Sequence, residues 1–483
     1  MPERNYQTKE EVVAQANIIL NKTLRDIIPA AEISVVESKI AEYGSSRKGF
    51  LGDLVEKYVF GLDTNSRSEA DFVIAGVELK TTPLKEHVKK TYVSKERLVF
   101  SMIDYAGVVG ETWETSSFLK KNSLLLLMFY LYFKEQGLLD YEFKFIHLLE
   151  LLKDISVQDI AQIKKDWEFI VDKIKRGEAH LLSEGDTYYL GACTKAKNNL
   201  VFRDQPHSAI KAKPRAFSLK QTYLNYLIQR RLMGRSEDAS SIFKEGQVAT
   251  INDVVEEKFR RFIGKTDKEI CEMLGWEPGE NKPKGYKRLL ANYVLVGTGS
   301  NDVEELDKAN ITLKAVALES DGSLKESISF PAFNYEDLVN QVWFDEENET
   351  MADFHAQLEM QRFLFVVFQK VGDTEDVVLK KIKFWNFPMA DIDKAKDVWD
   401  KTFELISDGK IVEKVVEMGN GEKKRYTYFP GTTFNGVAHV RPHGANSADV
   451  AVLPVADKLT GEKVYTKHCF WLNADYIKKA LED

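Results

Sequence analysis

Cysteine, long apolar runs and an export signal are scarce or missing in this sequence. The 483 residues include three cysteines, Cys193, Cys271 and Cys469, with no Cys-x-x-Cys pair and no histidine at ligand spacing. This pattern excludes a structural zinc site and fits a reducing compartment. The charged, amphipathic N-terminus lacks the apolar core of a signal peptide. The longest apolar run, residues 124–133, is about half the length that a bilayer crossing needs. We therefore expect a cytoplasmic protein without a membrane partner.

The chain also lacks the positive net charge that is common in nucleic-acid-binding proteins. Its formal net charge is -8, whereas a phosphate backbone attracts Lys and Arg. The charge is unevenly distributed, however. Residues 187–235 carry ten Lys and Arg against a single acid, Asp204, with aromatic residues among them. A charge run is more often a solvated face, but so basic a segment in an acidic protein predicts a surface for a polyanion.

Length and self-similarity together predict two tandem domains. With 483 residues and 44% hydrophobic content, the chain can bury more than one core. Four segments of the first half recur in the same order in the second half, which indicates a duplicated domain. They are 48–61, 76–80, 93–105 and 216–224, which resemble 284–297, 310–314, 323–335 and 469–477.

The composition between the repeats sets the expected domain boundaries. The polar stretch 233–250 is typical of a linker. We predict a first domain at 1–235, a linker at 236–250 and a second domain at 251–483. Each domain is expected to be α/β (or α+β), with a mixed sheet flanked by helices.

The hydrophobic pattern also predicts individual elements of the first domain. Apolar residues at helical spacing predict a helix within 49–61, and Ser156 is a plausible N-cap of a later helix. Apolar, β-branched runs predict strands at 72–80, 98–103 and 124–133.

The stretch "SEADFVIAGVELKTTP" holds the one copy of Asp-x6-Glu-x-Lys in the chain, formed by Asp71, Glu78 and Lys80. Glu-x-Lys recurs elsewhere, but never with an Asp seven residues before the Glu. Because strand side chains alternate, Glu78 and Lys80 point to the same side. Two charges at the end of an apolar run are costly to bury unless they are paired or bind an ion. The motif is therefore either a metal site or a Glu-Lys pair at a strand edge.

The second copy favours the metal site, because its charged positions are lost while its apolar ones persist. Lys80 keeps a counterpart, Lys314. The other four positions change: Glu56, Asp71, Glu78 and Lys121 stand opposite Asn292, Glu305, Thr312 and Met360. This loss predicts one active and one inactive copy.

Two carboxylates without His or Cys suit a hard ion such as Mg2+. A lysine beside the metal can orient or deprotonate a water. Together with the basic segment, these residues predict metal-dependent hydrolysis of DNA phosphodiesters.

Several blocks of the first half resemble the MutH family of endonucleases. In order, they are "GFLGDLVEKYVFG", "DFVIAGVELKTTP", "TWETSSFLKKNSLLLLMF", "YYLGACTKAKNN" and "AFSLKQTYL". The degenerate second copy and the ending "FWLNADYIKKALED" make the full length similar to the two-domain type II restriction-enzyme branch of that family. This resemblance implies a restriction-endonuclease-like core, dependence on Mg2+ and cleavage of double-stranded DNA at GATC.

The resemblance also assigns roles by position. It implies that Asp71 and Glu78 hold the metal, helped by the carbonyl of Leu79, and that Lys80 acts on the attacking water. Glu56 would support the site or a second ion. Lys121 matches an additional active-site lysine of the family. Its neighbour Lys120 competes for that role, and a surface lysine is the alternative.

DNA-binding residues carry over less completely. Where single-domain family members have Arg-Pro-Lys, this sequence has "CTK", so Lys195 matches and Cys193 replaces the arginine. The second copy has Arg441 and His443 at the matching places, and arginine reads guanine by paired hydrogen bonds. The alternative for Arg441 is a structural ion pair. The expected DNA contacts are Lys195, Lys197 and Lys220 in the first half, and Arg441 and His443 in the second.

One active site per chain predicts that two chains meet as a dimer on DNA to cut both strands. The second copy would then be an effector or second-site domain. As a restriction enzyme, the protein would act beside a cognate methyltransferase that protects the host site without forming a stable complex. Two other functions stay open: a strand-nicking endonuclease of the mismatch-repair type, and a non-catalytic DNA-binding regulator.

Overall fold

The computed structural model divides the chain into two compact units, which we call unit 1 and unit 2. It describes residues 5–43, 49–62, 69–87, 91–195, 200–234, 239–279, 282–283, 285–345, 350–372, 374, 376–419 and 423–482. Within these residues, unit 1 is formed by the chain up to Asp253 together with Asp302–Asn310, and unit 2 by the rest.

A mixed sheet with strand order β2-β1-β4-β5 lies at the centre of unit 1. Its strands are β1 (Glu78–His87), β2 (Thr91–Ser94), β4 (Leu124–Leu131) and β5 (Phe143–Glu150). β1 and β4 run parallel, while β1 and β2, and β4 and β5, run antiparallel. A parallel pair needs a crossover, here the segment from β2 to the helix that precedes β4.

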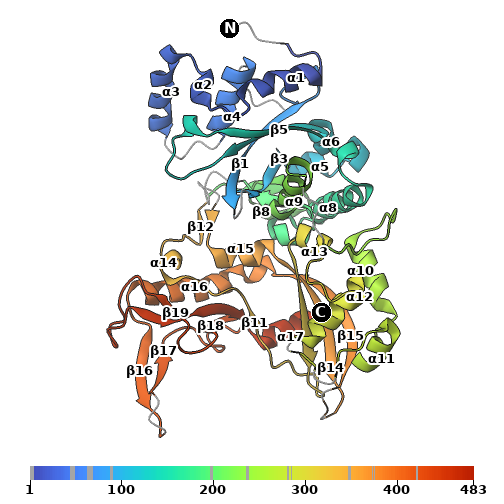
Figure 1. Cartoon of the computed structure of the whole chain (residues 1–483), viewed down its shortest axis with the longest axis vertical. Coiled ribbons are helices and arrows are strands. Elements are labelled where there is room, and N and C mark those ends of the chain that lie inside the picture. The colour runs from blue at the N-terminus through green and yellow to red at the C-terminus, as the bar shows by residue number, and fades with distance from the viewer. Residues whose placement is uncertain are drawn as a thin grey trace. The chain divides into compact units, whose positions relative to one another are not determined.

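N-terminal helices cover one face of this sheet (Figure 1). They are α1 (Lys9–Ala16), α2 (Leu24–Ile27), α3 (Ala30–Tyr43), α4 (Phe50–Val55) and the π-helix η3 (Glu56–Phe60). Their apolar side chains share one core with Leu79, Leu126 and Met128. Because strand side chains alternate, Glu78 and Lys80 face the opposite side.

Elements from the second half of unit 1 pack against that opposite side. Strands β3 (Leu98–Met102), β9 (Arg215–Leu219) and β6 (Leu190–Thr194) form an antiparallel sheet, and β7 (Arg203–Gln205) and β8 (Ser208–Ala212) form a hairpin. Further helices of unit 1 are α5 (Tyr105–Val108), α6 (Ser117–Asn122), α7 (Leu151–Asp154), α8 (Val157–Lys175), α9 (Gln221–Leu227), the π-helix η9 (Ile228–Leu232) and α13 (Glu304–Lys308).

Unit 2 has the same strand directions in the same order. In one sheet, β10 (Ile311–Leu318) runs parallel to β14 (Arg362–Lys370), which is antiparallel to β15 (Val377–Asn386). In another, β11 (Ile328–Ser329), β21 (His468–Leu472) and β18 (Ala438–Pro442) are antiparallel. These arrangements match β1, β4 and β5, and β3, β9 and β6, of unit 1.

Hairpins and helices complete unit 2. The hairpins pair β12 (Phe344–Asp345) with β13 (Thr350–Met351), β16 (Val412–Glu417) with β17 (Lys423–Thr427), and β19 (Val450–Val452) with β20 (Val464–Thr466). The helices are α10 (Ile251–Arg260), which begins at the boundary, α11 (Asp267–Leu274), α12 (Tyr286–Val296), α14 (Tyr335–Leu338), α15 (Asp353–Met360), α16 (Ile392–Ser407) and α17 (Ala474–Glu482). No helix in the described part of the chain combines the length and apolarity that a bilayer crossing requires.

Most of the expected local elements are present. Strands β3 and β4 fall in the predicted ranges, and α8 begins directly after Ser156, whose hydroxyl accepts a hydrogen bond from the N–H of Asp159. The expected strand at 72–80 is wrong in its first half, because β1 begins only at Glu78. Gly76 has a φ of 67°, and its N–H donates to the carbonyl of Phe72, which closes a turn.

The described part of the expected linker, residues 239–250, belongs to unit 1. Ile242 is fully buried. The Glu305 carboxylate accepts hydrogen bonds from the Ser241 hydroxyl and the Ile242 N–H. The composition of a polar stretch does not reveal that its hydrogen-bond partner, Glu305, lies about 60 residues further along the chain. Unit 1 extends to Asp253, beyond the domain end expected at 235.

Candidate active site

Glu78 is the centre of a charged cluster at the start of β1. Its side chain is 3% exposed. Lys80 Nζ donates to Glu78 Oε1 at 2.8 Å, and Lys121 Nζ lies 3.7 Å from the same oxygen. Burial raises the pKa of Glu78, and the positive charge of Lys80 opposes this shift.

The sheet register explains why Lys121 reaches the cluster. Leu125 of β4 is level with Glu78 of β1, and α6 ends only three residues before Leu125. The last turn of α6 therefore delivers Lys121 to the carboxylate. Lys120, its competitor in the sequence, is exposed. The structure thus brings Lys121 to Glu78 by a short helix-to-strand connection.

Asp71 is positioned by the turn that precedes β1. Its Oδ2 accepts a hydrogen bond from the N–H of Leu79 at 2.8 Å. This contact holds the Asp71 carboxylate against the backbone of β1, one residue from Glu78. The turn at residues 72–77, which the sequence pattern mistook for strand, is what gives Asp71 this position.

Glu56 adds a further negative charge from the helix η3. Burial, and then the charges of Asp71, Asp53 and Glu78, raise the pKa of Glu56 to about 7. Asp53 was missed by sequence reasoning, although it lies one helical turn before Glu56. Carboxylates gathered in this way repel each other unless protons or a cation neutralise them.

The residues present fit a divalent cation. Glu78 Oε2 is buried and has no hydrogen-bond partner among the described residues, and an unpaired buried oxygen is costly. The neighbouring acids Asp71 and Glu56 offer carboxylate oxygens, the ligand type that Mg2+ prefers. No group of three or more His, Cys, Asp or Glu side chains in the described ranges is arranged to hold a metal. A cation here would therefore need main-chain, water or substrate oxygens as well, for which the Leu79 carbonyl is a candidate.

The corresponding positions of unit 2 lack this cluster. Thr312 is level with Phe363 of β14, as Glu78 is with Leu125 of β4. Counting back four residues from each partner gives Lys121 and Glu359. The sequence comparison had placed Met360 opposite Lys121, and the strand register corrects this by one residue. A carboxylate therefore takes the place of the lysine, 3.4 Å from His355.

Comparison with known proteins finds a family-model match in the first half of the chain. The family model described as the DNA mismatch repair enzyme MutH matches residues 60–166. Over 505 aligned residues, covering 99% of both proteins, the chain is 36% identical to the type II restriction enzyme Sau3AI of Staphylococcus aureus. The chain belongs to the Sau3AI family.

MutH proteins match about half of this Sau3AI-family chain. The DNA mismatch repair protein MutH of Shigella flexneri is 27% identical over 240 residues, which is 47% of this chain and 94% of that protein. MutH of Escherichia coli is 27% identical over 239 residues, again 47% and 94%. The matched family region includes Asp71, Glu78, Lys80 and Lys121, whereas Glu56 lies just before it.

The expected DNA-binding residues of unit 1 have different environments. Lys195 follows β6, and its N–H donates to the carbonyl of Pro214. Lys197 lies outside the described residues. Lys220 is 3% exposed, and its ammonium donates to the carbonyl of Thr187. The Lys220 ammonium therefore makes a hydrogen bond inside the protein, at the start of α9, and is not available to DNA. A count of charges along the chain does not reveal this burial.

In unit 2 the expected recognition residues gather around Trp471. The Arg441 guanidinium lies 3.6 Å from the centre of the Trp471 ring, and the His443 ring meets the same indole edge-on at 5.4 Å. Arg441 and His443 are exposed. Sequence reasoning missed Trp471, although it lies in the quoted ending "FWLNADYIKKALED". An arginine stacked on a ring has a fixed plane, which suits paired hydrogen bonds to a base.

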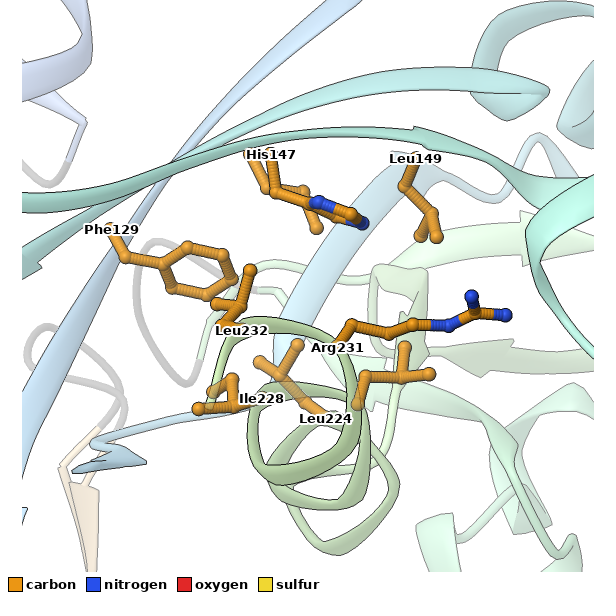
Figure 2. A pocket seen from close by; sticks show the side chains of 9 residues that line it. Phe129, His147, Leu149, Leu224, Ile228, Arg231 and Leu232 are labelled. Atoms are coloured by element: carbon orange, nitrogen blue, oxygen red, sulfur yellow. The ribbon is translucent and has the colours of Figure 1, made fainter. Parts of the chain in front are cut away.

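An apolar pocket lies on the same sheet face as Glu78, between that face and the helices α9 and η9. It is lined from β4 and β5 by Leu127, Phe129, His147 and Leu149, and from the helices by Leu224, Leu227, Ile228, Arg231 and Leu232 (Figure 2). Burial lowers the pKa of His147 and favours its neutral form. Such a lining suits packing between sheet and helix and offers no carboxylate for metal chemistry.

Proposed function

We propose that this chain is a type II restriction endonuclease that cuts double-stranded DNA at GATC, with Mg2+ bound by Asp71 and Glu78 of unit 1. The observation that carries the proposal is the buried Glu78 carboxylate, contacted by two lysines on one oxygen and unpaired on the other. Membership of the Sau3AI family supports it. The bound cation would supply Lewis-acid activation of water and phosphate.

In this proposal, each charged side chain of the unit 1 cluster has its own role in phosphodiester hydrolysis. Lys80, held at 2.8 Å by Glu78, would orient the attacking water by a hydrogen bond from its ammonium group. Lys121 neutralises negative charge that develops on the phosphate. The Leu79 N–H fixes one oxygen of Asp71, and the other oxygen would be available to hold the cation. Glu56, whose pKa is raised to about 7, would release its proton near neutral pH when the cation is bound.

Unit 2 is proposed to be a degenerate copy that binds DNA without cutting it. The recurring strand order and the replacement of Glu78 by Thr312 support this role. The exposed, stacked Arg441 supplies a guanine-reading group that unit 1 lacks at Cys193. In this proposal the catalytic domain is 1–235 together with the packed segment up to Asp253, and two chains meet on DNA to cut both strands. A methyltransferase that modifies the same site would protect the host.

Digestion of a defined plasmid tests the activity. Purified protein with Mg2+ should cut both strands at GATC, and sequencing of the fragment ends locates the cut. Nicks in one strand only, or a requirement for a partner ATPase, would favour the mismatch-repair-type enzyme. Parallel substrates with methylated adenine or cytosine identify the modification that protects the site.

A comparison of plasmids with one and two GATC sites tests the role of unit 2. At equal enzyme concentration, the two-site plasmid should be cut in both strands faster, because the second site occupies unit 2 or recruits a second chain. Equal rates would count against an effector role. A DNA-binding regulator would leave both plasmids intact under all conditions.

A further inference from the structure

Unit 2 carries the hairpin of β16 and β17 at a place where unit 1 has none. In unit 1, residues 176–189 connect α8 to β6 and form only the short 3-10 helices η7 (Ala179–Leu181) and η8 (Glu184–Asp186). In unit 2, residues 408–437 connect α16 to β18 and include both strands of the hairpin. Figure 1 shows that β16 and β17 extend away from the other elements of unit 2. The hairpin is therefore an addition to the duplicated fold, and any role that it has belongs to unit 2 alone.

Two lysines and a tyrosine share one face of this hairpin. Lys414 of β16 is the cross-strand partner of Tyr426 in β17, and Lys424 precedes Tyr426 by two residues, opposite Val416. Directly opposite residues and alternate residues point to the same side of a hairpin. These four residues therefore form one face, which we call the lysine face. Lys414 Nζ lies 5.0 Å and Lys424 Nζ lies 5.2 Å from the centre of the Tyr426 ring, so both ammonium groups make cation–π contacts with that ring.

The other face of the hairpin is turned toward the body of unit 2. There Arg425 pairs with Glu462 at 2.6 Å, and its guanidinium lies 5.6 Å from the centre of the Tyr465 ring in β20. Lys423, on the same face, is directly opposite Glu417. Each basic side chain of this face thus has an acidic neighbour. Because successive residues of a strand point to opposite sides, the lysine face is turned away from Tyr465.

The lysine face is exposed, and none of its four residues is acidic. Lys414 and Lys424 are exposed, and Tyr426 and Val416 are each 38% exposed. In the described part of the chain, neither lysine has an ion pair. Glu413, next to Lys414 in the sequence, lies in the register shift and outside the paired rows. Two uncompensated positive charges beside an aromatic ring, in a chain of net charge -8, favour a polyanion as the partner.

We propose that the lysine face binds the sugar-phosphate backbone of duplex DNA, with Lys414 and Lys424 on phosphates and the Tyr426 hydroxyl as a further donor. This inference rests on the proposed DNA binding by unit 2 and adds a contact separate from Arg441 on β18. Diagonal neighbours on a hairpin are about 7–8 Å apart, so both lysines reach phosphates of one strand. A two-stranded ribbon also fits the major groove of B-DNA. Phosphate contacts carry no sequence information, so the hairpin strengthens binding to any duplex.

Salt-dependent binding of the full chain to duplexes with and without GATC, both in EDTA, tests the lysine face. Lys414→Met and Lys424→Met should each reduce the slope of log affinity against log salt by about one. Each variant should bind about threefold to tenfold more weakly at about 150 mM salt. The loss should be equal for both duplexes, because only phosphate contacts are removed. Lys414→Arg and Lys424→Arg keep the charge and should bind as the unchanged protein does.

Lys423→Met is the matched control for these variants. It removes a lysine of the same strand from the opposite face, where Glu417 is its cross-strand partner. Its affinity for DNA should stay within about twofold of the unchanged protein. An equal loss in Lys423→Met would show that the overall charge of the hairpin attracts DNA, which would refute a specific role of the lysine face. Thermal unfolding midpoints of all variants verify that each chain folds.

A second copy of this chain is the competing occupant of the exposed face. Sedimentation velocity of the DNA-free chain measures self-association, and Tyr426→Ser removes the ring at the centre of the face. The proposal predicts equal sedimentation of Tyr426→Ser and the unchanged protein. If Tyr426→Ser reduces self-association, while Lys414→Met and Lys424→Met bind DNA as the unchanged protein does, the face joins two chains and the proposal is wrong.

Arg441→Ala separates this inference from the proposal on which it rests. A loss of GATC preference in Arg441→Ala, with unchanged affinity and salt slope in Lys414→Met and Lys424→Met, would overturn the role of the lysine face and leave DNA binding by unit 2 standing. If Arg441→Ala and the two lysine variants all bind as the unchanged protein does, both proposals fail.

Discussion

The buried carboxylate of Glu78 affects both the stability of the fold and the proposed binding of a cation. Two lysines contact one of its oxygens, while the other has no partner among the described residues. Such a carboxylate is costly in the metal-free protein, and a bound cation would stabilise it. The sequence motif predicted which residues meet. It did not predict the burial or the elevated pKa of Glu78, because these depend on the packing of both sheets around it.

Glu56 gives the site a pH dependence with a definite sign. Its pKa in the folded protein is about 7, against an ordinary value of 4.5. A raised carboxyl pKa means that the folded state binds more protons. The metal-free protein therefore loses stability from this group as pH rises from about 4.5 to about 7. Cation binding should recover that loss above pH 7.

We predict that Mg2+ raises the thermal unfolding midpoint more at pH 8 than at pH 6. Differential scanning calorimetry with and without Mg2+ measures the difference. In Glu56→Gln the pH dependence should shrink, because no proton is released there. Glu86→Gln, exposed near the end of β1, should behave as the unchanged protein does. An equal Mg2+ effect at both pH values would refute the role of Glu56.

At the scale of elements, the hydrophobic pattern predicted those helices and strands that depend on local sequence alone. The helix after Ser156 and the strands at 98–102 and 124–131 follow from capping and apolar runs. The turn at 72–77 was missed because its residues are as apolar as a strand, and Gly76 alone marks it. Burial of Lys220 was missed because charge counts carry no information on tertiary contacts.

Gly76→Ala should damage both stability and cleavage. A φ of 67° is costly for a residue with a Cβ, by about 1 kcal/mol. Nothing lies within 4 Å of the added carbon, so the cost comes from the backbone alone. Denaturant unfolding should show this loss, and cleavage should fall further because the turn positions Asp71. Gly431→Ala, also in open space but without a positive φ, is the control. Unchanged stability in Gly76→Ala would contradict the turn.

At the scale of the whole molecule, the chain does not divide where its composition changes. Residues 302–310 return to unit 1 between two segments of unit 2. There Lys308 is buried, 3.1 Å from Asp159 and 2.8 Å from Glu304. The repeats in the sequence predicted two units. The boundary between the units was not predictable, because contacts between residues far apart in the chain, such as Lys308 and Asp159, attach residues 302–310 to unit 1.

Lys308→Met should destabilise unit 1 by about 3 kcal/mol or more, because it leaves the buried Asp159 without this cation. Chemical denaturation measures the change. Lys325→Met removes an exposed lysine whose ion pair is solvated, and it should change stability by less than about 0.5 kcal/mol. A small effect of Lys308→Met would show that the segment contributes little to unit 1.

The central claim is that one unit cuts and the other does not. Cleavage of a plasmid with a single GATC site, with Mg2+, by Glu78→Gln and Thr312→Ala tests it most directly. Glu78→Gln should lose at least about a thousandfold in cleavage rate and still bind the plasmid, because the substitution keeps the side-chain volume. Thr312→Ala should cut within about threefold of the unchanged protein. Cleavage that survives in Glu78→Gln, or that disappears in Thr312→Ala, would contradict the account.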